Sequence, residues 1–125
     1  MVRLPTEAEL EILAVVWERG PSTVRDVLHA LQTKREIGYT TVLKLMQIMD
    51  DKNLLTCDKG VRPQVYRAAQ PRPTTQKQLV RNLLDRAFSG SAGSLILQAL
   101  STKKSTPEER RRIRELLDRL EEDSK

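Results

Sequence analysis

The sequence predicts a mainly α protein in which a winged helix-turn-helix is followed by a small domain of three helices. Two observations support this prediction. Residues 23–66 read as two capped amphipathic helices followed by a short hairpin, which is the element order of a winged helix-turn-helix. After a proline-containing break at residues 71–73, three more apolar stripes follow at helical spacing. We therefore expect one domain over residues 1–70 and a second over residues 71–125.

The first two helices are each expected to begin at a threonine. Thr6 and Glu9 form a capping box, in which each side chain bonds the backbone N–H of the other residue. The Gly-Pro pair at residues 20–21 ends this helix. Thr23 and Asp26 form a second, weaker box. Trp17 continues the first stripe, so we interpret it as a core anchor. The apolar stripes comprise Leu10, Leu13, Val16 and Trp17 in the first helix and Val24, Val27, Leu28 and Leu31 in the second.

The third helix, opening at residues 39–41 after a polar turn, has an inward and an outward face. Asn53 then suits the left-handed backbone conformation that often ends a helix. Helical spacing directs Val42, Leu45, Met46 and Met49 inward. The same spacing leaves Thr40, Thr41, Lys44, Gln47 and Asp51 outside, with Leu43 and Ile48 beside them.

A hairpin is expected next, with strands at residues 55–58 and 64–67 and a turn between them. Pro63 is compatible with this hairpin because an edge strand tolerates a missing N–H donor. Cys57 is expected to pack inward with Leu55, since a redox-sensing thiol needs an exposed and basic setting.

The C-terminal half is expected to contain three short amphipathic helices. Thr75 and Gln78 suggest a third capping box, and Thr106, Pro107 and Glu109 a clear start for the last helix. The Ser/Gly-rich segment 89–94 connects helices and is not a phosphate loop, because no strand precedes it and no Lys-Ser/Thr follows. A domain this small rarely buries enough surface alone. We therefore expect dimerisation through Leu79, Leu83, Leu84, Phe88, Leu95, Ile96, Ile113, Leu116, Leu117 and Leu120.

Composition and charge indicate the kind of partner. The chain has 125 residues and a net charge of +5, and basic side chains gain affinity for a polyanion by displacing its counterions. One cysteine cannot close an internal disulfide, which favours a reducing compartment. No run approaches the roughly 18–20 apolar residues of a membrane span, and the first residues lack a signal core. We expect a cytoplasmic protein with no membrane insertion.

The outward face of the third helix has the chemistry needed to read base edges. A helix fits the major groove of DNA, where Thr, Gln and Lys can each bond bases and an apolar side chain can contact a thymine methyl. Basic residues elsewhere in the winged domain suit contacts to the phosphate backbone. The predicted DNA-binding residues are Thr40, Thr41, Leu43, Lys44 and Gln47 on the third helix, Arg25 on the second, and Lys59 and Arg62 in the hairpin turn. A dimer would place two such helices on a palindromic double-stranded operator.

The sequence also bears on two other function classes, an enzyme and a protein-interaction module. An enzyme is not expected, because the sequence has one histidine, His29, and no Cys/His pair, activated serine, phosphate loop or metal-ligand spacing. For the same reason we expect no metal and no cofactor. The alternative is a winged-helix protein-interaction module that does not read DNA sequence. An acidic third-helix face would favour that alternative, whereas this face is polar and basic.

Three segments carry a resemblance to a known family: residues 4–17, beginning Leu-Pro-Thr-Glu-Ala-Glu-Leu; residues 39–55, beginning Tyr-Thr-Thr-Val and ending Leu-Leu; and Val65-Tyr66. In these the chain resembles the penicillinase-repressor (BlaI/MecI-like) family over nearly its whole length. The resemblance implies a DNA-binding winged domain, a helical dimerisation domain and a homodimeric repressor of a dyad-symmetric operator. It also implies that Thr40, Thr41 and Lys44 occupy DNA-reading positions.

The chain departs from the family pattern at several positions. Ile48 stands where a basic residue is common, and Asn53 replaces the usual glycine. The best-known members are inactivated when a membrane sensor's signalling leads to proteolysis between an Asn and a Phe in the dimerisation domain. The matching bond here is Gln98–Ala99, so the resemblance implies a membrane sensor and protease as partners but not this cleavage chemistry. The Cys-rich C-terminal motif of copper-responsive relatives is absent from residues 121–125.

Overall fold

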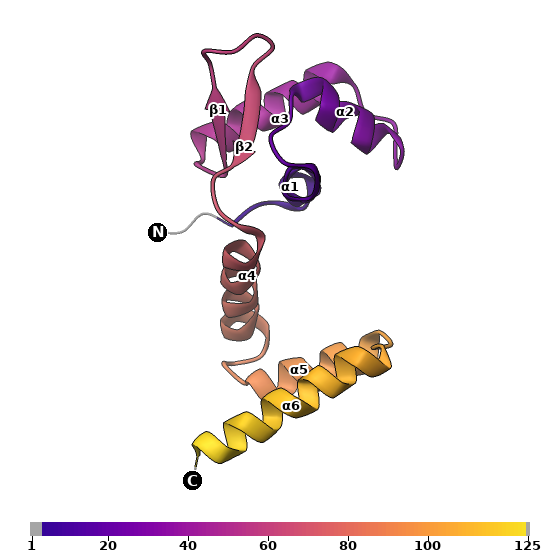
Figure 1. The fold of residues 1–125 in the computed structure, drawn as a ribbon, viewed down its shortest axis with the longest axis vertical. Helices are drawn as coiled ribbons and strands as arrows, with labels where there is room; N and C mark the ends of the chain where they lie inside the picture. The colour runs from indigo at the N-terminus through magenta and orange to yellow at the C-terminus, as the bar shows by residue number, and fades with distance from the viewer. Residues whose placement is uncertain (1–3, 125) are drawn as a thin grey trace. The chain divides into compact units, whose positions relative to one another are not determined.

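The computed structural model describes residues 4–124 (Figure 1). Residues 1–3, part of the segment considered above for a signal core, and residue 125, part of the one considered for a copper motif, lie outside the described residues. The chain divides into two compact units, one ending at Val80 and the other beginning at Arg81. In chain order the elements are α1 (Glu7–Arg19), α2 (Val24–Gln32), α3 (Tyr39–Asp51), β1 (Leu55–Asp58), β2 (Val65–Ala68), α4 (Arg72–Ala87), α5 (Ala92–Thr102) and α6 (Pro107–Asp123).

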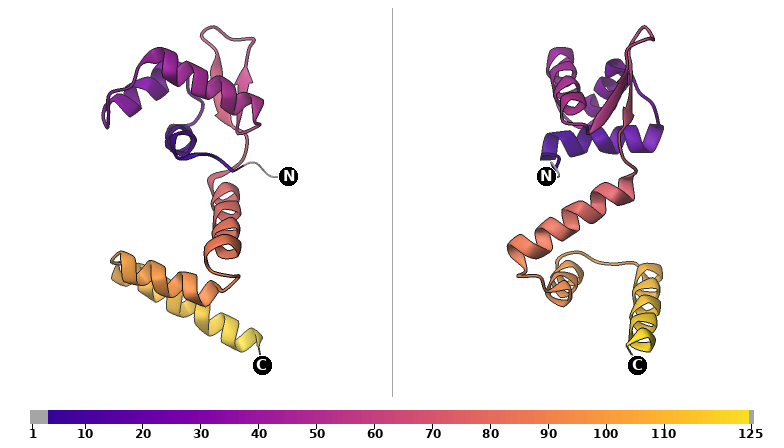
Figure 2. Two further views of the ribbon diagram at one scale, coloured as in Figure 1. Left: turned by 180° about the vertical axis from the view of Figure 1, so that it is seen from behind. Right: turned by 90° about the vertical axis from the view of Figure 1, so that its left-hand side faces the viewer.

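The first unit has the expected order of three helices and an antiparallel hairpin, seen from two further sides in Figure 2. In the register of the hairpin, Leu55 is opposite Ala68 and Cys57 is opposite Tyr66. The return strand begins at Val65, one residue later than predicted. Ser22, just before α2, exchanges two backbone hydrogen bonds of 2.8 and 2.9 Å with Tyr66. The hairpin is thereby fixed to the start of α2.

Local signals at the ends of α1, α2 and α3 were predicted correctly. Both threonine capping boxes are present, with the Thr6 side chain accepting from Glu9 and the Thr23 side chain from Asp26. Asn53 has φ 63°. The N–H of Leu54 donates to the carbonyl oxygen of Met49 at 2.8 Å, and the N–H of Asn53 donates to that of Asp50 at 3.1 Å. These two bonds form a Schellman motif that satisfies the last carbonyls of α3.

The core of this unit is built from the three helices and the hairpin. All four predicted stripe residues of α2 are buried, as are Leu13 and Val16 of α1. The α1 stripe was incomplete, because Ile12 is fully buried although the spacing argument omitted it, whereas Leu10 is only half-buried. The remaining buried apolar residues are Val42, Met46, Met49, Leu55 and Tyr66. Leu45 and Cys57 are half-buried and pack against this cluster.

Trp17 lies at the edge of the core and not in its centre. The residue is half-buried and packs against the apolar cluster. Its indole Nε1 donates to the backbone oxygen of Gln70 at 3.0 Å, and the Arg72 guanidinium lies 5.4 Å from the centre of its ring. Trp17 therefore attaches the segment that leads into α4 to the end of α1.

The start of α4 differs from the prediction. Residues 71–73 were expected to be a linker and Thr75 a helix cap, but α4 already begins at Arg72 and Thr75 is buried within its first turn. Pro73 is compatible with this position because the first N–H groups of a helix have no partner in the helix. The N–H groups of Thr74 and Thr75 donate to the Pro71 oxygen at 3.1 and 3.4 Å. The Thr75–Gln78 capping box was therefore a wrong prediction.

The described residues of the second unit do not form a buried core. The predicted capping box of α6 is present, with the Thr106 N–H donating to Glu109 at 2.8 Å and the Glu109 N–H to the Thr106 hydroxyl at 3.0 Å. Ser91 caps α5. No described side chain from Arg81 to Ser124 is buried. Among residues 4–124, every helix is too short or too polar to cross a lipid bilayer.

Candidate nucleic-acid interface

The outward face of α3 is open to solvent. Thr40, Thr41, Lys44 and Gln47 are all exposed, while Val42, Met46 and Met49 on the opposite side are buried. Thr40, Lys44 and Gln47 lie four and three residues apart, so they share one side of the helix. The amphipathic division predicted from the sequence therefore agrees with the observed burial.

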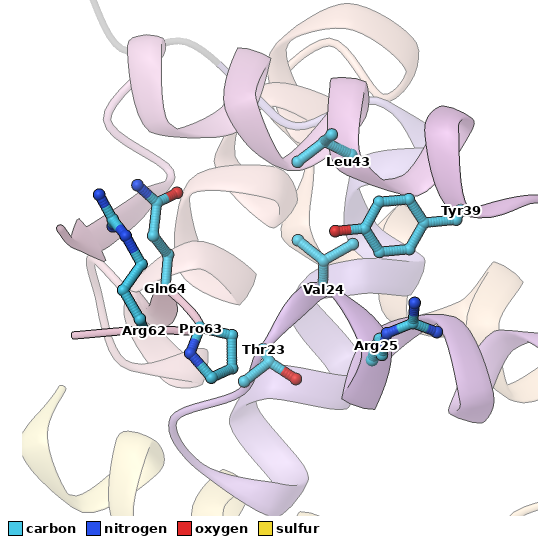
Figure 3. Close-up of a pocket in the computed structure, with 8 residues that line it drawn as sticks. All are labelled: Thr23, Val24, Arg25, Tyr39, Leu43, Arg62, Pro63 and Gln64. Atoms are coloured by element: carbon cyan, nitrogen blue, oxygen red, sulfur yellow. The ribbon is translucent and has the colours of Figure 1, made fainter.

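A cleft of about 440 Å³ lies beside this helix, bounded by the starts of α2 and α3 and the end of the hairpin turn. The cleft brings together three of the predicted DNA-binding residues, Arg25, Leu43 and Arg62 (Figure 3). The other predicted residues, Thr40, Thr41, Lys44, Gln47 and Lys59, do not line it. The candidate interface is therefore an exposed helix face next to a basic cleft.

Tyr39 is a cleft residue that the sequence argument did not name as a binding residue. It is the first residue of α3 and is 42% exposed. The Arg25 guanidinium carbon lies 5.2 Å from the centre of its ring, a cation–π distance. In Figure 3 its hydroxyl is directed toward the side of the cleft where Arg62 and Gln64 lie. An aromatic hydroxyl at the first position of the third helix was a signal that could have identified it.

The hairpin turn is held by its own hydrogen bonds. The Arg62 guanidinium donates to the Lys59 carbonyl oxygen at 3.2 Å, and the Gly60 N–H donates to Asp58 Oδ1 at 3.1 Å. Lys59 and Arg62 are both exposed. This arrangement keeps two basic side chains at the tip of the wing.

The N-termini of α2 and α3 differ in whether their backbone N–H groups are available to bind an anion. At α2 the Asp26 carboxylate accepts from the Thr23 N–H at 2.9 Å and lies 3.3 Å from the Arg19 guanidinium. The Thr23 N–H is the main cause that lowers the pKa of Asp26, so the first turn of α2 already carries its own anion. At α3 the cap residue is Gly38, which has no side-chain hydrogen bond to give. The first N–H groups of α3 are therefore left for an external acceptor.

The predicted dimerisation residues lie in α4, α5 and α6, apart from Phe88, which directly follows α4, and each is exposed or half-buried. Leu79 belongs to the first compact unit and the others to the second. In the second unit, Ile113 and Leu117 line a groove of about 750 Å³ together with Leu100 of α5. Gln98 and Ala99, at the position of the family's cleavage bond, are exposed residues within α5.

A winged helix whose third helix leaves a polar face uncovered, with Arg25 and Arg62 in the cleft beside it, has the architecture of a DNA-binding transcriptional regulator. Residues 5–119 match the family model described as penicillinase repressor. The chain belongs to this family, whose members are transcriptional regulators and not enzymes. The resemblance noted in the sequence is thereby confirmed.

Two curated relatives are both named transcriptional regulator BlaI and come from Mycobacterium tuberculosis, strains CDC 1551 / Oshkosh and ATCC 25618 / H37Rv. Each is 38% identical to this chain over 58 residues, which cover 44% of this chain and 42% of the relative. The match thus spans less than half the length of each curated relative.

Proposed function

We propose that this protein is a homodimeric transcriptional repressor that binds a dyad-symmetric DNA operator through α3 and the wing. The observation that carries the proposal is the exposed face of α3, with Thr40, Lys44 and Gln47 on one side of the helix. These side chains offer both donors and acceptors to base edges in the major groove. Membership of the penicillinase repressor family supports the same function.

The basic residues around this face suit contacts to phosphate. Arg25 and Arg62 lie on either side of the cleft next to α3, and Lys59 extends the positive charge along the wing. The uncapped N–H groups at the start of α3 offer further donors to a phosphate oxygen. Asp51, exposed near the other end of α3, would repel the DNA backbone. We therefore place the base-reading contacts in the first half of the helix.

The homodimer is supported by the absence of buried side chains in the described part of the second unit. From Arg81 to Ser124 no described side chain is buried, although apolar residues recur along all three helices. Helices of this length gain most of their stability from packing of an apolar face. A second copy would supply that packing and would also place two α3 helices on the two halves of a palindrome.

The second part of the proposal is that proteolysis in α5 relieves repression. The Gln98–Ala99 bond lies inside α5, where the Thr102 hydroxyl donates to the Gln98 carbonyl oxygen at 2.7 Å. A protease acts on a transiently opened segment. A membrane sensor and protease system would therefore need α5 to unwind locally before this bond is cut.

DNA titration over a salt series tests the proposal. The wild-type protein should bind a palindromic operator more tightly than a scrambled duplex of the same composition. Lys44→Ala should weaken the specific complex by about 1–3 kcal/mol and relax the preference at one base position. Arg25→Ala should weaken both complexes alike and reduce the salt slope by about one. Lys77→Ala, an exposed lysine on α4, is the matched control and should change neither.

Equal affinity for both duplexes at every salt concentration would contradict sequence reading. That result would instead favour the protein-interaction module as the function of this winged helix.

A further inference from the structure

Helix α6 presents an apolar row that the described residues of its own unit leave largely uncovered. Ile113, Leu116, Leu117 and Leu120 recur at the spacing that places side chains on one side of a helix. Leu116, Leu117 and Leu120 are 51%, 49% and 53% exposed. Three large apolar residues left half-exposed in a row indicate a contact surface.

The charges that flank this row differ between the two halves of the helix. After the capping residue Glu109, the first half carries Arg110, Arg112 and Arg114, and the second half carries Glu121 and Asp123 after Arg119. The last turn has no basic residue, although the partial negative charge at a helix C-terminus favours cations there. The acidic end is therefore unfavourable for the isolated helix and calls for a basic partner.

A groove of about 750 Å³ in the same unit offers the matching surface. Its floor is apolar, formed by Leu100, Ile113 and Leu117, and Lys104, Arg110 and Arg114 also line it. The lining contains no acidic residue. Arg110 is positioned by hydrogen bonds from its guanidinium to the Ser105 carbonyl oxygen at 2.6 Å and hydroxyl at 3.4 Å. This groove suits an occupant that is apolar on one side and acidic on the other.

We propose that the occupant is the last turn of α6 from a second copy of this chain, with the two α6 helices packed antiparallel. The inference rests on the proposed homodimer and specifies its orientation and register. In a twofold contact, if one residue meets another, the reverse contact also forms. The apolar rows match when Ile113 is opposite the partner's Leu120 and Leu116 is opposite the partner's Leu117.

This register pairs opposite charges beside the apolar row. On one side, Arg110 and Arg114 fall beside the partner's Glu121. On the other, Arg112 falls between the partner's Asp123 and the partner's Arg119. A parallel arrangement would instead place Arg110 beside the partner's Arg110 and Glu121 beside the partner's Glu121, and like charges in that position repel. Charge complementarity therefore selects the antiparallel pair.

Charge reversal in the full-length protein tests the register. Glu121→Arg should raise the dimer dissociation constant at least tenfold in low salt, because the twofold axis repeats each altered contact. Arg114→Glu should have a similar effect, and an equimolar mixture of the two variants should recover a heterodimer close to wild type in affinity. Glu122→Arg is the matched control, because Glu122 lies on the side of α6 away from the apolar row, and it should change the constant by less than about threefold. Analytical ultracentrifugation measures all four.

Cysteine cross-linking provides a readout of orientation that does not depend on affinity. In a Cys57→Ser background, Ile113→Cys and Leu120→Cys proteins should form a disulfide with each other when mixed and oxidised. Each should form little disulfide with itself.

The results of these experiments distinguish the proposed antiparallel register of α6 from the existence of the homodimer. Self-cross-linking of each cysteine variant, or a wild-type dimer that Glu121→Arg does not weaken, would overturn the antiparallel register and leave the homodimer intact. A wild-type protein that is monomeric at micromolar concentration would overturn both proposals.

Discussion

Lys52 and Glu9 form a buried ion pair whose disruption should destabilise the first unit strongly. Glu9 is 1% exposed. Its carboxylate accepts from Lys52 Nζ at 2.9 and 3.2 Å and from the Thr6 N–H at 2.8 Å. Lys52 follows the last residue of α3, so this contact joins the first turn of α1 to the end of the proposed recognition helix. The sequence analysis identified Glu9 only as a helix-capping residue, and it did not identify Lys52 as its ion-pair partner.

The expected magnitude follows from the burial of the two groups. At 2.9 Å and an effective dielectric constant of about 20, two unit charges attract by about 6 kcal/mol before the cost of burying them is counted. Removing one partner of a buried pair costs about 3–5 kcal/mol, because the other charge is left without compensation. The Lys52 side chain is 26% exposed, so water can partly replace it. We therefore expect Lys52→Met to lower the free energy of unfolding by about 3 kcal/mol.

Urea denaturation at one fixed protein concentration measures this loss, since association would otherwise shift the apparent stability. Lys44→Met is the matched control, because Lys44 is an exposed lysine on the same helix and its replacement should change the free energy of unfolding by less than about 0.5 kcal/mol. If Lys52→Met is no more destabilising than this control, the ion pair makes no net contribution and the reasoning is wrong.

The same pair predicts a dependence on pH. Burial raises the pKa of Glu9, but the hydrogen bonds from the Thr6 N–H and Lys52 outweigh that effect and hold the pKa below its ordinary value of 4.5. A carboxyl group with a lowered pKa in the folded state stabilises fully above its unfolded pKa, and the contribution is lost as pH falls through the folded value. The wild-type protein should therefore lose stability below about pH 4.5, and the Lys52→Met variant should lose less over the same range.

Three further predictions concern the first unit. Burial raises the pKa of Tyr66 from 10.0 to about 12. Because the hydroxyl ionises first in the unfolded state, the free energy of unfolding should fall by up to about 3 kcal/mol as pH rises through this interval. Tyr66→Phe should remove that loss in an alkaline unfolding series. Asn53→Ala should destabilise by about 1 kcal/mol because φ at this position is 63°, whereas Asn53→Gly should not, and thermal unfolding will separate the two. Ile12→Ala should cost about 3 kcal/mol in urea denaturation because Ile12 is fully buried; a loss no greater than that of Ile48→Ala, at a largely exposed position, would contradict its place in the core.

Much of the fold was predictable because its signals are local. A capping box needs only residues three positions apart, so Thr6, Thr23 and Thr106 could each be recognised as a helix start. The start of α4 was not predicted, because the local signal there is ambiguous. Proline normally interrupts a helix, but near the first turn it does not, and the sequence alone gave no reason to prefer one reading of residues 71–75.

The candidate interface was predicted in part. Helical spacing was enough to separate the exposed face of α3, with Thr40, Lys44 and Gln47, from its buried face. The cleft was not predictable in this way, because Arg25, Tyr39 and Arg62 come from three different elements. Their proximity depends on how α2, α3 and the hairpin pack, and no spacing along the chain encodes that distance.

The sequence by itself determined the starts of α1, α2 and α6 and the alternation of apolar and polar faces, because each depends on residues within a few positions of one another. Only the tertiary structure decided that Lys52 is paired with Glu9, that Trp17 holds the segment before α4, and that the Arg25 guanidinium lies against the Tyr39 ring. These contacts join residues that are distant along the chain. Their energies depend on burial and on distances of a few ångströms, both of which are set by packing.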